Sequence, residues 1–266
     1  MNKREQGRRY RALVLRALSH LGYATTRQLA KIVWRGCDES SRKMAGRSLR
    51  WLLAEGYVVS RRNGDSVNGE MLVAVTKAGA NWLAEHDEPL PHKKGEQAKA
   101  HARDWLRHAH SHRTACNSVY AARVGLSHDR FAWSELEIRS GLSPLGYIAY
   151  RYNEQTLHKI PDVLFEHPDG LIWVEVENAP RSEKDVAKAV ASMRRMAIDR
   201  RIAEIHFVIT APGAKTIGQR LRKALTHAPD SAWPRQVKEW DAVLLAKKVK
   251  VFTLNSETLE LTPVEF

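Results

Sequence analysis

Three carboxylates stand close together in the segment HKIPDVLFEHPDGLIWVEVENAP, which covers residues 158–180. They are Asp162, Glu175 and Glu177. The apolar residues around them are typical of buried β-strands. The tetrapeptide HPDG at 167–170 suits a β-turn, with proline at the second position and glycine at the fourth. The segment therefore predicts a hairpin of two strands, 160–166 and 171–177, that carries three acids.

The register of this hairpin predicts where the acids meet. If Pro168 and Asp169 are the central pair of the turn, Asp162 lies directly opposite Glu175. Side chains paired in this way have Cβ atoms about 5 Å apart, a distance at which two carboxylates favour a shared cation. Because strand side chains alternate, Glu177 points to the same face as Glu175.

Three converging carboxylates predict a site for Mg²⁺ or Mn²⁺, which prefer hard oxygen ligands. Such an ion orients a water molecule, lowers its pKa and stabilises charge that develops on a phosphodiester. The alternative is a structural network in which Arg or Lys side chains neutralise the acids.

A mixed α/β pattern surrounds the hairpin. One or two helices are expected between residues 97 and 126, and segment 131–142 is ambiguous between strand and helix. The expected elements that follow are a strand at 146–152, the two hairpin strands, a helix at 182–200, a strand at 204–210, a helix at 215–226 and late strands near 242–254.

The first segment of the chain shows three helical patterns followed by two strands and a further helix. The expected helices cover 10–23, 25–34 and 39–56, the strands 57–62 and 70–75, and the last helix 76–86. This order of elements is that of a winged helix-turn-helix.

The third helix carries a basic face. Lys43, Arg47 and Arg50 fall on one side, whereas Ala45, Leu49 and Leu52 fall on roughly the opposite side. Arg61 and Arg62, at the base of the predicted wing, add two more cations. These five basic residues are predicted to bind double-stranded DNA. The alternative is a solvated basic face on a domain that binds other proteins.

The composition supports a polyanionic partner. The 266 residues include 43 Lys and Arg against 30 Asp and Glu, a net charge of +13. Residues 1–85 carry 16 of these basic and 7 of the acidic side chains. The two cysteines, Cys37 and Cys116, form no C-x-x-C motif, which fits a reducing cytoplasm. No run of 18 apolar residues occurs, so an intracellular, cytoplasmic protein that does not span a membrane is expected.

A break in the pattern predicts the domain boundary. The segment HDEPLPHKKGEQ at 86–97 combines two prolines, a glycine and many charges. We expect a winged helix-turn-helix domain at 1–85, a linker at 86–97 and an α/β domain at 98–266.

The acidic hairpin resembles the PD-(D/E)XK signature of restriction-endonuclease-like nucleases. Pro161-Asp162 is followed by Glu175-Val176-Glu177, with Glu177 where the signature has lysine. Together with WSELEIR upstream and the winged helix, the chain resembles MobC-type plasmid relaxases and related replication-relaxation proteins. The resemblance implies a restriction-endonuclease-like fold and nicking of DNA at a specific origin during plasmid mobilisation or replication, alongside plasmid transfer or replication proteins. It makes Asp162 and Glu175 metal ligands, and Glu135 an additional acid.

The missing lysine leaves three interpretations open. In the first, Glu177 binds a second metal or acts as a base. In the second, a lysine comes from the helix that starts at Ser182, where Lys184 is the candidate and Lys188 lies one turn further on. The third interpretation is that catalysis is lost and the chain is a DNA-binding regulator of replication or transcription. A restriction or repair nuclease is a further alternative, which would cut without needing one origin.

A histidine-rich segment, RHAHSHR at 107–113, offers a competing metal site. His108 and His110 match the His-hydrophobic-His pattern of another relaxase class, but the helical pattern around them would place the two rings on different faces. His108 and His112 could bind a metal as an i, i+4 pair on a helix. His158 is a lone histidine, for which a structural role is expected.

Overall fold

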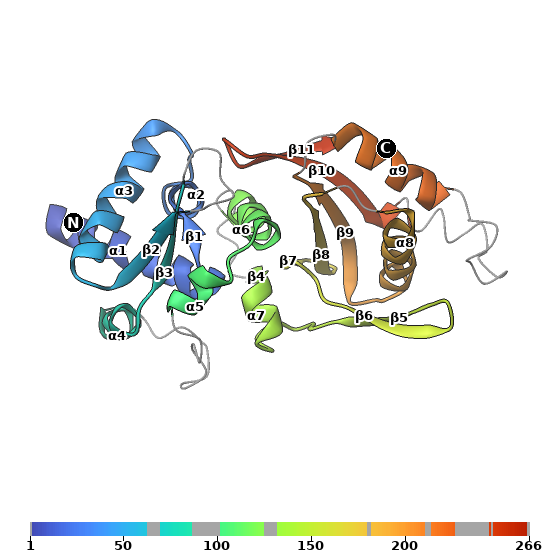
Figure 1. Ribbon diagram of the computed structural model, residues 1–266, viewed down its shortest axis with the longest axis horizontal. Coiled ribbons are helices and arrows are strands. Elements are labelled where there is room, and N and C mark those ends of the chain that lie inside the picture. Colours follow the sequence, from blue (N-terminus) through green and yellow to red (C-terminus); the bar gives the residue numbers. More distant parts are fainter. Residues whose placement is uncertain are drawn as a thin grey trace. The chain divides into compact units, whose positions relative to one another are not determined.

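The computed structural model of the chain describes residues 2–62, 70–86, 102–124, 132–179, 182–210, 214–226, 245 and 247–264. The chain folds into two compact units, coloured from blue to green and from green to red in Figure 1. Unit 1 comprises Met1–His128 with Glu257–Leu259, and unit 2 comprises Asp129–Ser256 with Glu260–Phe266. Both units contain helices and a sheet, so the predicted mixed α/β class is confirmed.

Unit 1 begins with three helices, each of which starts after a capping residue. The Asn2 side chain accepts a hydrogen bond from Glu5 N, and the Asp38 side chain accepts one from Ser41 N. Thr25 caps the middle helix through a complete capping box. All three predicted helices are confirmed, namely α1 (Lys3–Leu21), α2 (Thr26–Trp34) and α3 (Glu39–Ala54).

A small antiparallel sheet and a fourth helix follow. The sheet has the order β1-β3-β2, and the predicted strand pair and the helix after it are confirmed. The turn between β2 and β3 lies outside the described residues. The elements are β1 (Ala24–Thr25), β2 (Val58–Arg62), β3 (Met71–Val75) and α4 (Lys77–His86).

Two further helices belong to unit 1, although the sequence pattern assigned them to the second domain. They are α5 (Ala102–Arg107) and α6 (Ser111–Val124). Buried polar groups hold α6 in unit 1, because Asn117 Nδ2 donates to Tyr23 O (2.8 Å) and Gln28 Nε2 donates to Thr114 O (2.9 Å). Helix α5 contacts β2 and β3. The expected boundary at 86–97 lies outside the described residues, apart from His86.

Unit 2 is built on a six-stranded sheet with the order β11-β10-β9-β8-β7-β4. Strands β8, β9 and β10 are parallel to one another, and the other pairs are antiparallel. The strands are β4 (Ala132–Ser134), β7 (Val163–His167), β8 (Gly170–Glu177), β9 (Ile202–Ile209), β10 (Val249–Asn255) and β11 (Glu260–Val264).

Helices connect the parallel strands, because a parallel pair needs a crossover rather than a tight turn. Helix α8 (Glu183–Ala197) joins β8 to β9, and α9 (Ala214–Thr226) follows β9 (Figure 1). The predicted helices at 182–200 and 215–226 are confirmed. Met193 and Met196 of α8 pack in one core with Trp173 and Phe207, which point to this face of the sheet. The carboxyl ends of β8 and β9 lie together at one edge of the sheet, as Glu177 pairs with Ile209 there.

A second hairpin precedes the acidic one. Its strands are β5 (Ile148–Tyr152) and β6 (Gln155–Lys159), of which only the first was predicted. Asn153 and Glu154 between them both have positive φ, at 46° and 62°. This backbone suits a two-residue hairpin turn, which usually contains glycine. Because the turn has none, sequence patterns did not indicate β6.

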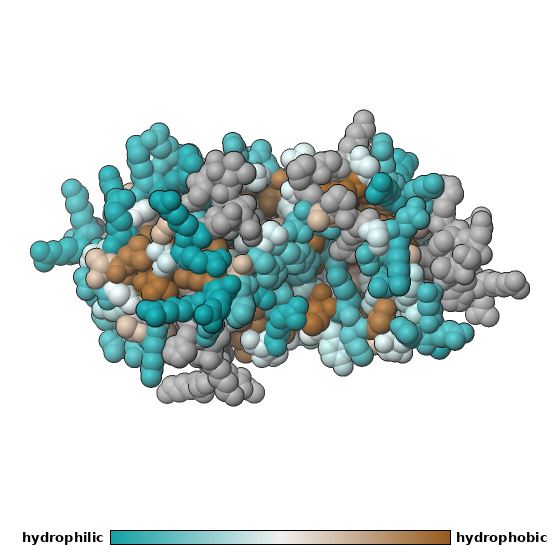
Figure 2. Space-filling view, viewed as in Figure 1, coloured by the Kyte–Doolittle hydropathy of each residue, from teal (hydrophilic) through white to brown (hydrophobic). Residues whose placement is uncertain are grey.

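Segment 131–142, which was ambiguous, contains both kinds of structure. Strand β4 ends at Ser134, whose side chain caps the short helix α7 (Glu135–Arg139) in a capping box with Glu137. The late strands expected near 242–254 are β10 and β11, which lie further along the chain. Among the described residues, no helix combines the length and apolar character needed to cross a bilayer. The face seen in Figure 2 is mostly hydrophilic in both units.

The acidic hairpin turns at Gly170, and we expect this position to reject any larger residue. Gly170 has φ 141°, and an added Cβ would lie 2.6 Å from Arg201 O. Gly170→Ala should lower the free energy of unfolding by about 1–3 kcal/mol, measured by urea unfolding followed by circular dichroism. Gly146→Ala is the control, because nothing lies within 4 Å of its added Cβ. Equal stability of the two variants would contradict the strain assigned to Gly170.

Candidate active site

Asp162 lies beside Glu175, at the end of the hairpin remote from the turn. The predicted register is confirmed, since Val163 pairs with Val174. Asp162 directly precedes β7, and its N donates to Val174 O (3.1 Å) while its Oδ2 accepts from Val176 N (2.7 Å). The backbone on both sides of Glu175 therefore holds Asp162 in place.

Glu175 is the most deeply buried of the predicted site acids, with 1% of its surface exposed. Its Oε1 accepts a hydrogen bond from Trp173 Nε1 (2.6 Å), and its Oε2 forms an ion pair with Lys159 Nζ (2.7 Å). Lys159 is the last residue of β6, three positions before Asp162. A buried carboxylate needs such partners, because an uncompensated charge in the interior is costly.

Sequence reasoning missed Lys159, because strand β6 was not predicted. The one available signal was the sequence HKIPD, where a single residue, Ile160, separates the lysine from the Pro-Asp pair. The structure nevertheless places a lysine at the acidic hairpin, from a strand before the motif rather than within it.

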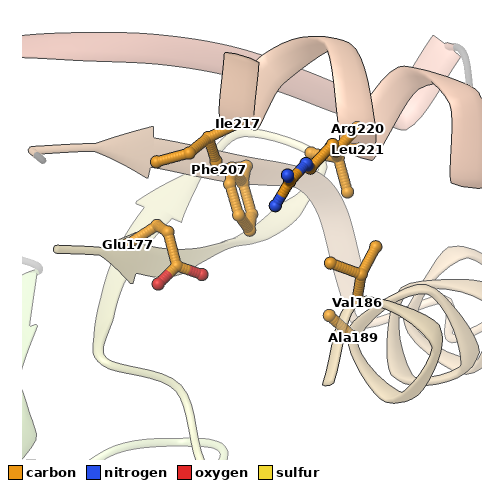
Figure 3. Close-up of a pocket in the computed structure, with 7 residues that line it drawn as sticks. All are labelled: Glu177, Val186, Ala189, Phe207, Ile217, Arg220 and Leu221. Atoms are coloured by element: carbon orange, nitrogen blue, oxygen red, sulfur yellow. The ribbon is translucent and has the colours of Figure 1, made fainter. Parts of the chain in front are cut away.

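Glu177 ends β8 and is 5% exposed. Its backbone O accepts from Thr210 N (2.8 Å), which ties the ends of β8 and β9 together. In Figure 3 its carboxylate lies at a small cavity that also receives the guanidinium of Arg220. The cavity has a volume of about 20 Å³, enough for one water molecule. Its other lining residues are Val186, Ala189, Phe207, Ile217 and Leu221.

Glu135 is the first residue of helix α7 and directly follows Ser134, which pairs with Val163, the neighbour of Asp162. Its Oε1 accepts from Arg139 Nε (2.7 Å), and Glu135 is 7% exposed. Asp162, just before β7, thus lies opposite Glu175 of β8, and Glu135 begins the helix that follows the neighbouring strand β4. All three offer the oxygen atoms that Mg²⁺ and Mn²⁺ prefer.

The described contacts of the α8 lysines do not include Asp162 or Glu175. Ser182 caps the helix as expected, and its Oγ accepts from Asp185 N (3.2 Å). Lys184 is exposed, and Lys188 Nζ lies 3.8 Å from Asp185. The lysine in contact with Glu175 is therefore Lys159.

A second charged group lies on the opposite face of the sheet. Glu204 Oε2 lies 2.6 Å from His206 Nε2, and its other oxygen pairs with Lys250. Burial raises the pKa of Glu204, but hydrogen bonds from Lys250 and His206 outweigh this effect and hold the pKa below its ordinary value. This acid is paired with His206 of its own strand and with Lys250 of β10, and it stays ionised.

In unit 1, helix α3 has the two faces that its sequence predicts. Ala45, Leu49 and Leu52 are buried. The three basic residues on the other side are exposed, namely Lys43, Arg47 and Arg50. Lys43 Nζ lies 2.6 Å from Glu39, so part of its charge is neutralised on the helix.

Strand β2 carries Arg61 and Arg62, both exposed. Arg61 lines an open groove of about 690 Å³ together with Arg103 and Arg107 of α5. The floor of the groove is apolar and includes Leu106. These two α5 arginines were not singled out by their sequence, because they become neighbours of β2 only through packing.

The histidines at 108–112 do not share one helix. His108 lies in the turn after α5, His110 precedes α6, and His112 lies within α6, so the expected i, i+4 pair of His108 and His112 does not form. His112 Nε2 contacts Cys116 Sγ at 3.6 Å. His158 packs edge-on against the Tyr147 ring, and both residues are exposed.

Comparison with known proteins identifies one protein family. The sequence model of this family, described as "Replication-relaxation", matches residues 15–201, which is more than half of the chain. No curated protein and no solved structure matches the chain.

The hydrogen bond from Trp173 to Glu175 should be worth a measurable share of stability. Trp173→Phe removes the N–H donor to a buried carboxylate and shrinks a fully buried ring, so the free energy of unfolding should fall by about 2–4 kcal/mol. The same change in a Glu175→Gln background should cost at least about 1 kcal/mol less, because the charged acceptor is gone. Urea unfolding of the two single variants and the double variant measures this coupling, and strictly additive losses would contradict it.

Proposed function

Because the chain belongs to the replication-relaxation family, we propose that it is a metal-dependent endonuclease that nicks DNA at a specific origin during plasmid mobilisation or replication. Unit 1 binds the duplex as a winged helix-turn-helix, and unit 2 cuts as a restriction-endonuclease-like domain. The single observation that carries this proposal is the pair of buried acids Asp162 and Glu175, which lie opposite each other at the end of the hairpin remote from its turn.

The residues present fit a divalent cation. Asp162, Glu175 and Glu177 offer only oxygen donors, and a cation, the ammonium of Lys159, already lies 2.7 Å from Glu175. When bound, Mg²⁺ or Mn²⁺ supplies an activated water molecule and stabilises charge on the phosphodiester. The chain's own part is to fix the carboxylates on rigid strands, where Val176 N orients Asp162 and Trp173 orients Glu175.

The position of the acids also supports a binding site. They lie at or near the carboxyl end of β8, where the parallel strands β8 and β9 end together. Open α/β sheets bind ligands at this edge, because the connecting loops leave room there. Glu135 serves as the additional acid of the site. Glu177 faces the small cavity and binds a second metal or acts as a base. Lys184, at the exposed start of α8, remains a candidate for contact with DNA.

Unit 1 has the features that duplex binding requires. The exposed side of α3 carries Lys43, Arg47 and Arg50, and β2 adds Arg61 and Arg62. A basic helix face of this kind lies in the major groove or on the phosphate backbone in helix-turn-helix proteins. The arginines of α5 extend the positive surface along β2.

One observation favours a second function, a non-catalytic DNA-binding regulator of replication or transcription. Both carboxylate oxygens of Glu175 already have partners within the protein, Trp173 and Lys159. An acid satisfied in this way can serve stability alone. The two functions differ in whether the acids bind a metal.

The first test is Mn²⁺ binding and nicking by the wild-type chain and by Asp162→Ala. We expect calorimetry to detect Mn²⁺ binding to the wild type and at least a tenfold weaker affinity for the variant. Nicking of supercoiled plasmid that carries the cognate origin should fall at least a hundredfold, because a metal ligand is lost.

Asp169→Asn is the matched control for this test. Asp169 is an acid of the same hairpin, but its side chain is 86% exposed at the turn. This variant should bind Mn²⁺ and nick as the wild type does. A wild-type chain that binds origin DNA yet neither binds Mn²⁺ nor nicks would establish the regulator instead.

A separate prediction concerns the basic face of α3. Arg47→Ala should weaken binding to all duplex sequences and should reduce the slope of log affinity against log salt concentration by about 1, because one phosphate contact is lost. Fluorescence anisotropy with a labelled duplex at several salt concentrations measures the slope. Lys77→Ala, which removes an exposed cation of α4, should leave the slope unchanged. Equal slopes for wild type and Arg47→Ala would show that α3 does not contact phosphate.

A further inference from the structure

Lys159 and a divalent cation would need the same oxygen of Glu175. The carboxylate has two oxygens, and in the protein Oε1 accepts from Trp173 while Oε2 pairs with Lys159. A metal ligand must offer at least one of them. This inference rests on the proposed metal site, at which either Trp173 or Lys159 must leave its oxygen of Glu175.

Trp173 is the partner that stays. It lies two residues from Glu175 on the same strand, and its ring is fully buried in the core of unit 2. Moving the indole would disrupt packing that involves α8 and β9. Oε1 therefore keeps its hydrogen bond.

Lys159 is the partner that can leave. Its side chain is 27% exposed, whereas that of Glu175 is 2% exposed, so the ammonium approaches the acid from the solvent side. It comes from a different strand, at the end of the β5–β6 hairpin, on a flexible four-carbon stem. Rotation of this stem frees Oε2 without a change in the core.

Charge repulsion makes the exchange obligatory. An ammonium at 2.7 Å from Oε2 and a divalent cation on the same oxygen would repel each other strongly in a partly buried site. The ammonium remains tethered, since Ile160 and Pro161 alone separate Lys159 from Asp162. Once released, it stays within a side chain's length of the acids and faces the phosphate that the site would bind.

We propose that Lys159 is the lysine that the Glu175-Val176-Glu177 motif lacks. In the metal-free protein it neutralises Glu175, and on metal binding it exchanges to the phosphate of the DNA. The function of the motif lysine is thus retained from strand β6, while Glu177 occupies its usual place in the sequence.

The exchange can be tested on the wild-type protein by chemical labelling. Reductive methylation with formaldehyde, followed by peptide mass spectrometry, measures the accessibility of each lysine amine. Saturating Mn²⁺ should raise the labelling rate of Lys159 at least threefold and leave that of Lys184 unchanged. In Asp162→Ala, which loses the metal, the rate at Lys159 should not rise.

Substitution gives a second, independent readout. Lys159→Met should bind Mn²⁺ at least threefold more tightly, because the competing ammonium is gone, yet nick at least tenfold more slowly at saturating Mn²⁺. Lys247→Met, which removes an exposed lysine of unit 2 with no role in the proposed site, is the matched control and should change neither quantity. Tighter binding joined to slower nicking is a pattern that a merely structural lysine would not produce.

The outcomes separate this inference from the proposed function. If Mn²⁺ binds but the labelling of Lys159 does not change, the exchange is wrong and the metal site stands. If wild-type protein binds no Mn²⁺ and nicks no origin, the proposed function and the exchange both fail. Since the labelling experiment uses the unaltered chain, it decides the question even if Lys159→Met does not fold.

Discussion

The ion pair between Lys159 and Glu175 is the interaction on which the site in unit 2 depends. Glu175 lies inside a six-stranded sheet at 1% exposure, where an ionised carboxylate without partners would cost several kcal/mol. Trp173, on the same strand, donates a hydrogen bond to one of its oxygens, and Lys159, from a separate hairpin, forms an ion pair with the other. The β5–β6 hairpin must therefore end beside β8, and only Ile160, Pro161 and Asp162 connect β6 to β7.

The two units differ in the charges that their candidate sites present. Helix α3 and strand β2 present cations on an ordinary helix-and-sheet scaffold, whereas unit 2 gathers its acids at the edge where its parallel strands end. Carboxylates close to a phosphodiester repel it unless cations intervene. In the proposed function, the basic excess of the first 85 residues holds the duplex, and a metal at the acids supplies the chemistry.

Local sequence signals predicted much of this architecture. The helices of unit 1 have capping residues and apolar stripes, and the register of the acidic hairpin follows from the HPDG turn. Features that depend on packing were not predictable. The turn at Asn153 and Glu154 has no glycine, so β6 and with it Lys159 were missed, and α6 joins unit 1 through buried side chains such as Asn117 that no periodicity reveals.

The surroundings of residue 177 suit a glutamate, although the PD-(D/E)XK signature has lysine at this position. The side chain at 177 faces a small, largely apolar cavity that Arg220 also lines (Figure 3). A lysine there would place two cations at one cavity, whereas glutamate places opposite charges there. The lysine at Glu175 comes instead from β6, at the solvent side of the site. Lys159 thus supplies the positive charge beside Glu175, and Glu177 supplies a negative charge at the cavity lined by Arg220.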